Sequence, residues 1–496
     1  MNSRFSRLGV YSLQLSPFIL YRDLFGDKNK KRKIFSISDV EKHNTINDGW
    51  IIYNNNVYNV TNFIQNHPGG IDMIEKGLGK NIKQYWDQYP IHYDKKVTDL
   101  LTPYYIGKLD EDSINLLESE QKNTSDQNIK DSKYTIIKKE SPLNIESHLH
   151  QLRSSFITDE NNWYVRNHHS IPRIDGEKFR LEIDISNSVK KYSLEDLKKF
   201  KKTEIVSTIQ CAGNRRDEFN SLDRVLGLTW NGGAISNAKF GGVLLRDILD
   251  DMKIDITKLS GNEFVQLFGI DLPFDASIPI SKVLDISGDV LLAYEMNDNE
   301  LSPVHGYPIR IIVPGYSGAK NIKWLNKIKI SEEESNSTWQ KGIAYKPLPS
   351  NIKSVEDIKN IDISEIPTVD ALPVQSMICN IYNNSTIKFK DGYINLKGIA
   401  YSGKGRNIVR VEISTDNGAN WELANLGDGS NQEKNRAWAW TFWDLNLKIP
   451  KNKDKLEIWC RAVDSDYNTQ PKNLEDIWNV RGILNNTWHK VLVFID

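Results

Sequence analysis

A polar stretch that begins near residue 111 sets the main limit on how this chain can fold. From Glu111 to about Lys133 most residues are charged or polar, and such a segment cannot bury enough apolar surface to fold by itself. At roughly 150 residues per domain, a chain of 496 residues is expected to hold about three domains. We therefore expect a flexible linker over residues 111–140, with independent domains on its two sides.

The sequence patterns on the two sides indicate where those domains lie. Residues 33–110 alternate strand-like pieces with short helical ones, which predicts a small α+β domain. Residues 141–373 mix strands, helices and glycine-rich loops, which predicts a large α+β domain. Residues 374–496 consist of short alternating runs such as 409–413, separated by turn residues such as Asp416-Asn417-Gly418. This last pattern is typical of a β-sandwich, so the predicted fold class is multi-domain, with two α+β domains and a C-terminal sandwich.

Charge and hydropathy exclude some classes of partner. Lys and Arg number 64 and Asp and Glu number 65, so no overall positive field favours nucleic acid. No run of eighteen apolar residues predicts a membrane span. Residues 1–32 contain Arg4, Arg7 and Arg22, and no acidic residue precedes Asp23. This composition is typical of a mitochondrial presequence or of an ordinary disordered basic tail.

The three cysteines are far apart and show no CxxC spacing, so they predict neither a zinc site nor a disulfide framework. Cys211 lies in the block Ile209-Gln210-Cys211-Ala212-Gly213-Asn214-Arg215-Arg216. Neighbouring positive charge favours a thiolate, which is a soft metal ligand. The residues alone leave open a metal ligand, a nucleophile or a buried structural cysteine. Cys379 and Cys460 show no such surroundings and are interpreted as packed thiols.

Two histidines in the N-terminal domain form a possible haem site. His67 precedes Pro68-Gly69-Gly70, where bare backbone can approach a flat macrocycle, and His92 follows 25 residues later (92 − 67 = 25). Two neutral imidazoles can fill both axial positions of haem iron and make the group an electron carrier. A turn histidine and an unrelated surface histidine are the alternative.

Residues 33–110 resemble the cytochrome b5 family. The resemblance rests on Asn59-Val60-Thr61-Asn62-Phe63, on His67-Pro68-Gly69-Gly70 and on the segment 101–109, which ends Tyr105-Ile106-Gly107-Lys108-Leu109. It implies a b-type haem held by His67 and His92.

Several blocks of the second half resemble the sulfite oxidase and assimilatory nitrate reductase family. These blocks are 163–168 (Trp-Tyr-Val-Arg-Asn-His), 211–216, 227–242, 291–296 and 305–315. The resemblance implies a molybdenum–molybdopterin cofactor with Cys211 as the protein ligand of molybdenum. It implies that the cofactor is bound by Tyr164, Arg166, Asn167, His168, Cys211, Asp271, His305, Arg310 and Lys323. It further implies that Arg166, Tyr345, Arg481 and the indole of Trp230 form a sulfite pocket around Cys211.

The same resemblance implies the reaction and the partners. Sulfite would be oxidised to sulfate, and the electrons would pass through the haem to cytochrome c. The C-terminal segment resembles the immunoglobulin-like dimerisation domain of the family, notably at Leu372-Pro373-Val374-Gln375-Ser376 and Ala437-Trp438-Ala439-Trp440, which implies a homodimer. The basic N-terminus and the acceptor together predict the mitochondrial intermembrane space.

Two other functions compete with this prediction. A nitrate reductase shares the molybdenum core, but in those enzymes the haem domain follows that core, whereas here it precedes it. A haem-only electron carrier with an inert molybdenum core is the second alternative. The joint presence of Arg166, Cys211, Tyr345 and Arg481 argues against it.

Overall fold

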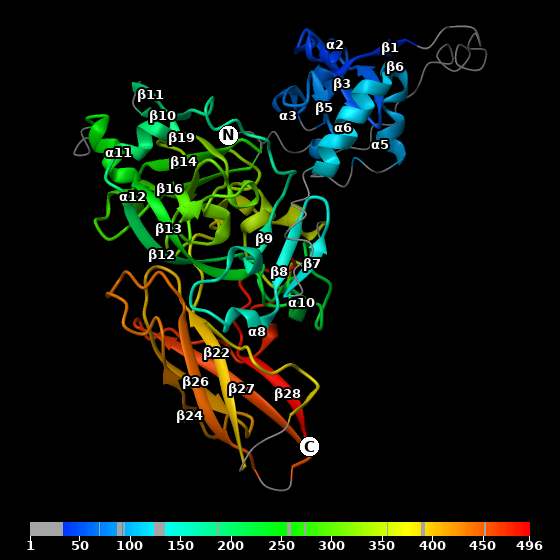
Figure 1. The fold of residues 1–496 in the computed structure, drawn as a ribbon. Coiled ribbons are helices and arrows are strands. Elements are labelled where there is room, and N and C mark those ends of the chain that lie inside the picture. Colours follow the sequence, from blue (N-terminus) through cyan, green and yellow to red (C-terminus); the bar gives the residue numbers. More distant parts are fainter. Residues whose placement is uncertain are drawn as a thin grey trace. The chain divides into compact units, whose positions relative to one another are not determined.

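The computed structural model describes residues 33–496, except for residues 69, 87–91, 93–94, 124–133, 186–187, 255–258, 272–273, 355, 388–391 and 451–452. The expected presequence over residues 1–32 lies outside the described residues. The chain divides into two compact units, Met1–Glu120 and Gln121–Asp496 (Figure 1). Across the part of the chain that the structure describes, no helix combines the length and the apolarity that a membrane crossing requires.

The first unit is a small α+β domain built on one six-stranded sheet. The strand order is β1-β6-β4-β3-β2, with β5 paired to β3. The strands are β1 (Ile34–Phe35), β2 (Asn44–Thr45), β3 (Asp48–Tyr53), β4 (Asn56–Asn59), β5 (Lys80–Asn81) and β6 (Tyr105–Leu109). The α-helices are α2 (Ile37–Glu41), α3 (Ile71–Glu75), α4 (Lys83–Trp86), α5 (Lys95–Asp99) and α6 (Glu111–Asn123).

Helix α6 contradicts the predicted linker, which was expected to begin at residue 111. Asp110 Oδ1 accepts a hydrogen bond from Ser113 N at 2.8 Å, and acidic residues occupy the first turn, where the helix dipole favours them. Ile114 and Leu117, three positions apart, pack against the core cluster that contains Val40. The helix is therefore fastened to the core of the first unit. The end of the predicted linker is also wrong, because Thr135–Lys139 form strand β7.

The α+β part of the second unit contains three sheets, ordered β12-β13-β16-β17 with β18 on β16, β11-β10-β19-β14-β15, and β7-β8-β9. Their strands are β7 (Thr135–Lys139), β8 (Asn144–Ser147), β9 (Val165–Arg166), β10 (Leu181–Ile185), β11 (Ser188–Tyr192), β12 (Thr203–Gln210), β13 (Ile235–Leu244), β14 (Phe264–Gly269), β15 (Asp275–Pro279), β16 (Leu291–Met296), β17 (Asn299–Glu300), β18 (Arg310–Ile312) and β19 (Leu325–Ser331). The α-helices are α8 (Leu149–Leu152), α9 (Leu194–Lys198), α10 (Arg216–Phe219), α11 (Leu245–Asp251) and α12 (Ile280–Leu284).

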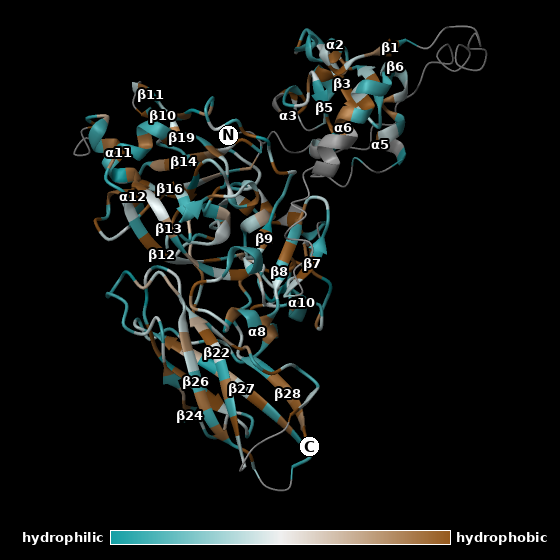
Figure 2. Ribbon diagram, viewed as in Figure 1, coloured by the Kyte–Doolittle hydropathy of each residue, from teal (hydrophilic) through white to brown (hydrophobic). Residues whose placement is uncertain are grey.

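The C-terminal part is the predicted β-sandwich. One sheet is ordered β20-β22-β26-β25 and the other β21-β28-β27-β23-β24. The strands are β20 (Gln375–Ile378), β21 (Ser385–Ile387), β22 (Tyr393–Tyr401), β23 (Ile408–Ser414), β24 (Glu422–Leu423), β25 (Asn425–Leu426), β26 (Thr441–Lys448), β27 (Lys455–Asp464) and β28 (His489–Ile495). Apolar and polar residues alternate along these strands (Figure 2), so one face of each strand is buried between the sheets.

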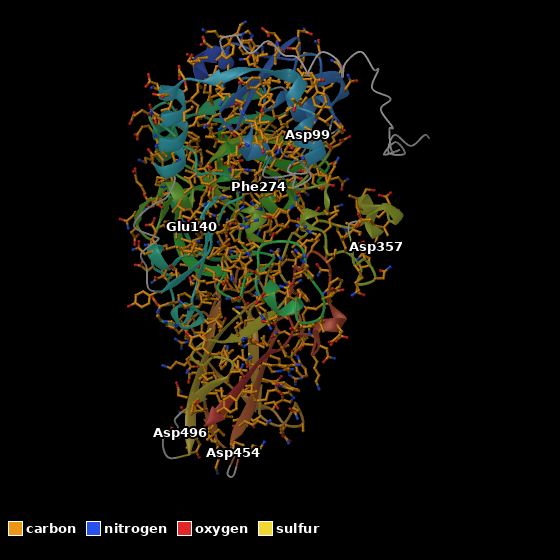
Figure 3. The ribbon with its side chains drawn as sticks, turned by 90° about the vertical axis from the view of Figure 1, so that its right-hand side faces the viewer. Asp99, Glu140, Phe274, Asp357, Asp454 and Asp496 are labelled. Carbon is orange, nitrogen blue, oxygen red and sulfur yellow. The ribbon has the colours of Figure 1, made fainter. Side chains whose placement is uncertain are left out.

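The sandwich packs tightly on the α+β part of the second unit. Met377, Ile399 and Phe442 of the sandwich share a buried cluster with two residues of the α+β part. These are Ala212, which follows Cys211, and Ile235, the first residue of β13. At the opposite end of the sandwich, Asp454 and Asp496 lie close together (Figure 3), where Ile495 N donates to Asp454 O at 2.9 Å. Because Met377, Ile399 and Phe442 belong to β20, β22 and β26, the sheet β20-β22-β26-β25 is the one that the α+β part partly covers.

Candidate active site

The two histidines of the first unit face each other. The ring centroids of His67 and His92 are 6.5 Å apart and the ring planes differ by 20°. A metal that two imidazole nitrogens bind at about 2 Å each would place the ring centroids roughly 6 Å apart. The pair therefore has the spacing that two axial ligands of one iron require.

Each histidine is held in place by its own contacts. His67 Nδ1 lies 3.1 Å from Gly70 O, and a carbonyl can only accept, so Nδ1 carries the proton and Nε2 keeps its lone pair. Burial lowers the pKa of His67, which keeps the ring neutral. Trp86 Nε1 donates to His92 O at 2.8 Å, and the two rings lie 4.6 Å apart. Gly70 has a φ of +89°, a conformation that favours glycine in this turn.

A cavity in the second unit gathers most of the predicted molybdenum-site residues. The space between its walls is roughly 690 Å³, a figure that includes the open mouth. Ten of the twelve residues predicted for this site line it: Tyr164, Arg166, Asn167, His168, Cys211, Asp271, His305, Arg310, Lys323 and Tyr345. Residues from strands, loops and 3-10 helices far apart in sequence thus meet at one place.

Cys211 lies in a tight turn directly after strand β12. Its N–H donates to Ala234 O at 3.0 Å, and its carbonyl accepts from Asn214 N at 2.9 Å. Asn214 Oδ1 in turn accepts from Ala234 N at 2.9 Å. A Cβ at Gly213 would lie 2.2 Å from Arg216 Nη2, so only glycine lets that guanidinium pass close to the turn. The backbone N–H and carbonyl of Cys211 are therefore both hydrogen-bonded, which fixes the position of the thiol at the cavity wall.

Buried cations line another part of the cavity. Burial lowers the pKa of Arg310 to about 10 and that of Lys323 to about 7. Arg310 donates to His305 O and Asn321 O, yet its Nε finds no partner in the described part of the chain. Lys323 donates to Asn167 Oδ1 and to Val304 O. An anionic ligand would supply the missing acceptor and raise the pKa of both groups, which favours their charged forms.

His168 and Tyr345 form a neutral hydrogen-bonded pair in the cavity. Tyr345 ends the 3-10 helix Ile343–Tyr345, and its hydroxyl lies 3.3 Å from His168 Nε2. Burial raises the pKa of Tyr345 to about 12, and burial also holds the pKa of His168 well below its usual value. The His168 ring stacks on Phe274, which is labelled in Figure 3, with the centroids 4.5 Å apart. Both side chains can donate hydrogen bonds without carrying charge.

Asp271, His305 and Tyr164 add further polar groups. Burial raises the pKa of Asp271 to about 7 and lowers that of His305 to about 3. Burial also raises the pKa of Tyr164. A Cβ at Gly318 would lie 3.0 Å from the Tyr164 hydroxyl, so backbone approaches this side chain closely.

Two predicted residues do not lie on the cavity wall. The Trp230 side chain is fully buried and belongs to the core cluster that contains Cys211. Arg481 lies in the C-terminal domain, between the 3-10 helix Leu474–Asp476 and β28. Burial lowers the pKa of Arg481, with Tyr345 and Arg166 as its charged or titratable neighbours. The C-terminal domain therefore does reach the edge of the site.

Arg216 was considered in the sequence only as positive charge near Cys211, and the structure gives it a further role. Its guanidinium donates to Arg481 O at 3.2 Å, Gly482 O at 3.0 Å and Leu228 O at 2.6 Å. Burial lowers its pKa to about 10, and nearby Cys211 raises it. In the sequence, the feature that connects Arg216 with the site is its position five residues after Cys211.

The residues present fit a molybdopterin cofactor. Over the described ranges no three His, Cys, Asp or Glu side chains gather to hold a metal, so a metal at Cys211 needs ligands from a cofactor. Asn167 Nδ2 and Arg310 Nε are buried polar atoms without partners in the described residues, and both belong to side chains that line the cavity. Fold and site together define a molybdopterin-type oxidoreductase with an attached cytochrome b5-like domain.

Comparison with known proteins agrees with this class. Three family models match: the oxidoreductase molybdopterin binding domain over residues 168–339, the Mo-co oxidoreductase dimerisation domain over 367–495 and the cytochrome b5-like heme/steroid binding domain over 36–110. The mitochondrial sulfite oxidase of Drosophila melanogaster is 38% identical over 93% of this chain and 81% of its own length. That of Homo sapiens is 35% identical over 93% of this chain and 84% of its own length.

More distant matches share only part of the chain. A nitrate reductase [NADPH] of Fusarium oxysporum is 31% identical over 71% of this chain but only 42% of its own length. The structure of the sulfane dehydrogenase SoxCD from Paracoccus pantotrophus has a TM-score of 0.58 at 23% identity, covers 71% of this chain and 87% of that chain, and shares the fold. The chain belongs to the sulfite oxidase family.

Proposed function

We propose that this protein oxidises sulfite to sulfate at a molybdenum–molybdopterin centre and passes the electrons through a b-type haem. The observation that carries the proposal is one cavity that joins a buried cysteine to fixed cations and neutral donors. The match to sulfite oxidases over 93% of the chain supports the same substrate.

The cofactor is held by groups of complementary chemistry. We assign Cys211 as the molybdenum ligand, and Tyr164, Arg166, Asn167, His168, Asp271, His305, Arg310 and Lys323 as the residues that bind the pterin and its phosphate. Arginine forks and a lysine suit a phosphate, and a carboxyl group suits pterin N–H donors. When bound, the molybdenum centre supplies the oxygen-atom transfer and takes up two electrons.

The substrate is a small anion without an apolar part, so its pocket must offer positive charge and hydrogen-bond donors. Arg166 and Arg481 provide the charge, and the Tyr345 hydroxyl provides a donor that stays protonated because its pKa is about 12. Trp230, buried behind Cys211, would act through packing. The overall reaction is sulfite plus water to sulfate, two protons and two electrons.

We propose that His67 and His92 would hold the b-type haem, which when bound would carry the electrons away one at a time. Support comes from their 6.5 Å centroid spacing and near-parallel rings. We further propose cytochrome c as the acceptor, the mitochondrial intermembrane space as the location and a homodimer formed by the C-terminal domain. The names of the relatives support the mitochondrion, and the dimerisation-domain match supports the dimer.

Anaerobic mixing with sulfite tests the function. Haem absorbance of the purified protein should change to the reduced form on mixing with sulfite, and this response should be lost in Cys211→Ser, whose haem spectrum should stay intact. Oxidation of dithionite-reduced haem by nitrate, with no response to sulfite, would instead assign a nitrate-reducing activity.

A further inference from the structure

Strand β8 carries two buried polar side chains that the proposed mechanism does not use. Asn144 and Glu146 are two positions apart, so both point to the same face of the strand. They are 1% and 0% exposed, and neither lines the cavity. A polar side chain that is fully withdrawn from water needs partners to offset its lost hydration. Those partners belong to two different segments, the one that carries Arg166 and the loop 231–233 that leads to Ala234, which binds the Cys211 backbone.

Asn144 holds the segment that carries Arg166. Its Oδ1 accepts from Arg166 Nη1 at 3.0 Å and from Asn167 N at 3.1 Å. Its Nδ2 donates to Asn167 O at 3.1 Å, and Arg166 Nη1 also donates to Asn167 O at 2.7 Å. One amide therefore ties both the backbone of this segment and the guanidinium that faces the cavity.

Glu146 holds the loop 231–233. Its Oε2 accepts from Asn231 N at 2.8 Å and from Gly233 N at 3.2 Å. Its Oε1 forms an ion pair with Lys138 Nζ at 3.1 Å, and the Lys138 side chain is itself only 14% exposed. The carboxylate thus anchors two backbone N–H groups while its charge is balanced from β7.

The anchored loop leads directly to the molybdenum ligand. Trp230 precedes it and Ala234 follows it, and Ala234 O accepts from Cys211 N at 3.0 Å. The loop lies directly against β8, since Ser147 N donates to Gly233 O at 3.3 Å. A displacement of this loop would move the residue that holds the Cys211 backbone.

We infer that Asn144 and Glu146 are positioning residues that align the two sides of the site from one strand, Asn144 the arginine side and Glu146 the cysteine side. The inference rests on the proposed function for the roles of Arg166 and Cys211. Because the two side chains act on different groups, their loss has different consequences. Loss of Asn144 weakens the hold on the substrate anion, and loss of Glu146 alters the surroundings of the metal.

The test uses the full-length holoprotein with sulfite as the probe, and measures turnover, KM for sulfite, molybdenum content and the Mo(V) EPR signal. Asn144→Ala should raise KM on the order of tenfold with kcat within about twofold, because the charge-assisted contact to Arg166 is lost. Glu146→Gln should lower kcat on the order of tenfold with KM nearly constant, because small displacements at a reacting centre are costly. Only Glu146→Gln should shift the EPR signal.

A rescue variant separates positioning from simple destabilisation. In Glu146→Gln the new amide N–H₂ faces the Lys138 ammonium, so two donors oppose each other. In Lys138→Met/Glu146→Gln this conflict is removed and the remaining oxygen can accept from the loop. The double variant should therefore return kcat to within about threefold of wild type and restore the EPR signal.

Val411→Ala is the matched control. Val411 is fully buried in the sandwich core, so its truncation should lower stability at a place away from the site. The inference is overturned if Asn144→Ala and Glu146→Gln only lower the melting temperature, as this control does, with unchanged KM, kcat and EPR signal. It is equally overturned if both variants show the same kinetic defect. Absence of any sulfite response in the wild type would reject the proposed function, whereas molybdenum content and the EPR signal of dithionite-reduced protein would still report on Glu146.

Discussion

The three cysteines of this chain differ in what surrounds the sulfur atom. Burial raises the pKa of Cys379 to about 12 and that of Cys460 to about 11, so both remain protonated thiols inside the sandwich. Cys211 instead lies beside Arg216 at a cavity wall. The interpretation of Cys379 and Cys460 as packed thiols agrees with their burial, and only Cys211 is placed to bind a metal.

Tyr345 leads to a prediction about pH. Because its pKa is about 12, the hydroxyl is a neutral donor throughout the range from pH 6 to 9.5. Tyr345→Phe should lower kcat/KM for sulfite by roughly tenfold, the value of one hydrogen bond to a charged group, and by the same factor at both pH values. Steady-state assays at the two pH values test this. A loss confined to pH 6 would mean that the phenol ionises within this range, because a phenolate can no longer donate at pH 9.5.

His489 should make the second unit less stable in acid. Burial lowers its pKa to about 4, and its Nδ1 accepts from Ile378 N at 3.2 Å. Between pH 6.5 and 4 the unfolded state binds the proton more readily than the folded state, so stability falls as pH falls through this window, by up to about 3 kcal/mol. His489→Gln should flatten the decrease of melting temperature over this range. Val411→Ala, which lowers stability without removing a titratable group, should keep the wild-type slope.

At the scale of elements, the contact between β8 and the loop 231–233 depends on the absence of a side chain. A Cβ at Gly233 would lie 1.8 Å from Ser147 O, a distance that no real contact allows. Gly233→Ala should therefore separate the two segments, lower the melting temperature and reduce the molybdenum content of purified protein. Gly261→Ala is the control, since a Cβ there meets nothing within 4 Å although its φ of +84° makes alanine strained. Equal molybdenum content in both variants would contradict the importance of the contact.

The local patterns of the sequence predicted some elements well. Alternating residues predicted the sandwich, because alternation is a short-range regularity. The spacing of His67 and His92 alone left a turn histidine and an unrelated surface histidine open, and the haem pair was expected from the resemblance to the cytochrome b5 family. Helix α6 was missed because its polar composition outweighed two weaker signals, the Asp110 cap and the apolar pair Ile114 and Leu117. The residues of the cavity wall came from resemblance and not from periodicity.

Other features depend on contacts that no local pattern reveals. Arg216 binds the carbonyls of Arg481 and Gly482, more than 260 positions later in the chain. The role of Asn144 and Glu146 likewise depends on partners in distant loops. Such pairings are decided by the tertiary fold, and a single sequence carries no signal for them.

For the whole molecule, the proposed homodimer should use the sheet of the sandwich that the α+β part leaves uncovered. On β24 and β28, Leu423 and Phe494 are 64% and 42% exposed and alternate with core residues such as Val493. Leu423→Lys/Phe494→Lys should shift the protein toward a monomer in size-exclusion chromatography with light scattering. Tyr467→Lys, a change at an exposed turn residue, should leave the mass unchanged. A double variant that keeps the wild-type mass would place the dimer contact elsewhere.

The two consecutive arginines after the cysteine turn have a consequence for how the protein is made. Arg215 donates to Thr487 O at 2.7 Å, and Arg216 donates to the carbonyls of Arg481 and Gly482, all close to the C-terminus. These carbonyls lie more than 260 positions after the arginines, so the turn that presents Cys211 lacks these partners until the later segment has been synthesised and folded. We therefore expect the cofactor to be retained only after residues 481–487 have folded onto the turn, and a chain that stops before Arg481 should keep the haem domain but not the second cofactor.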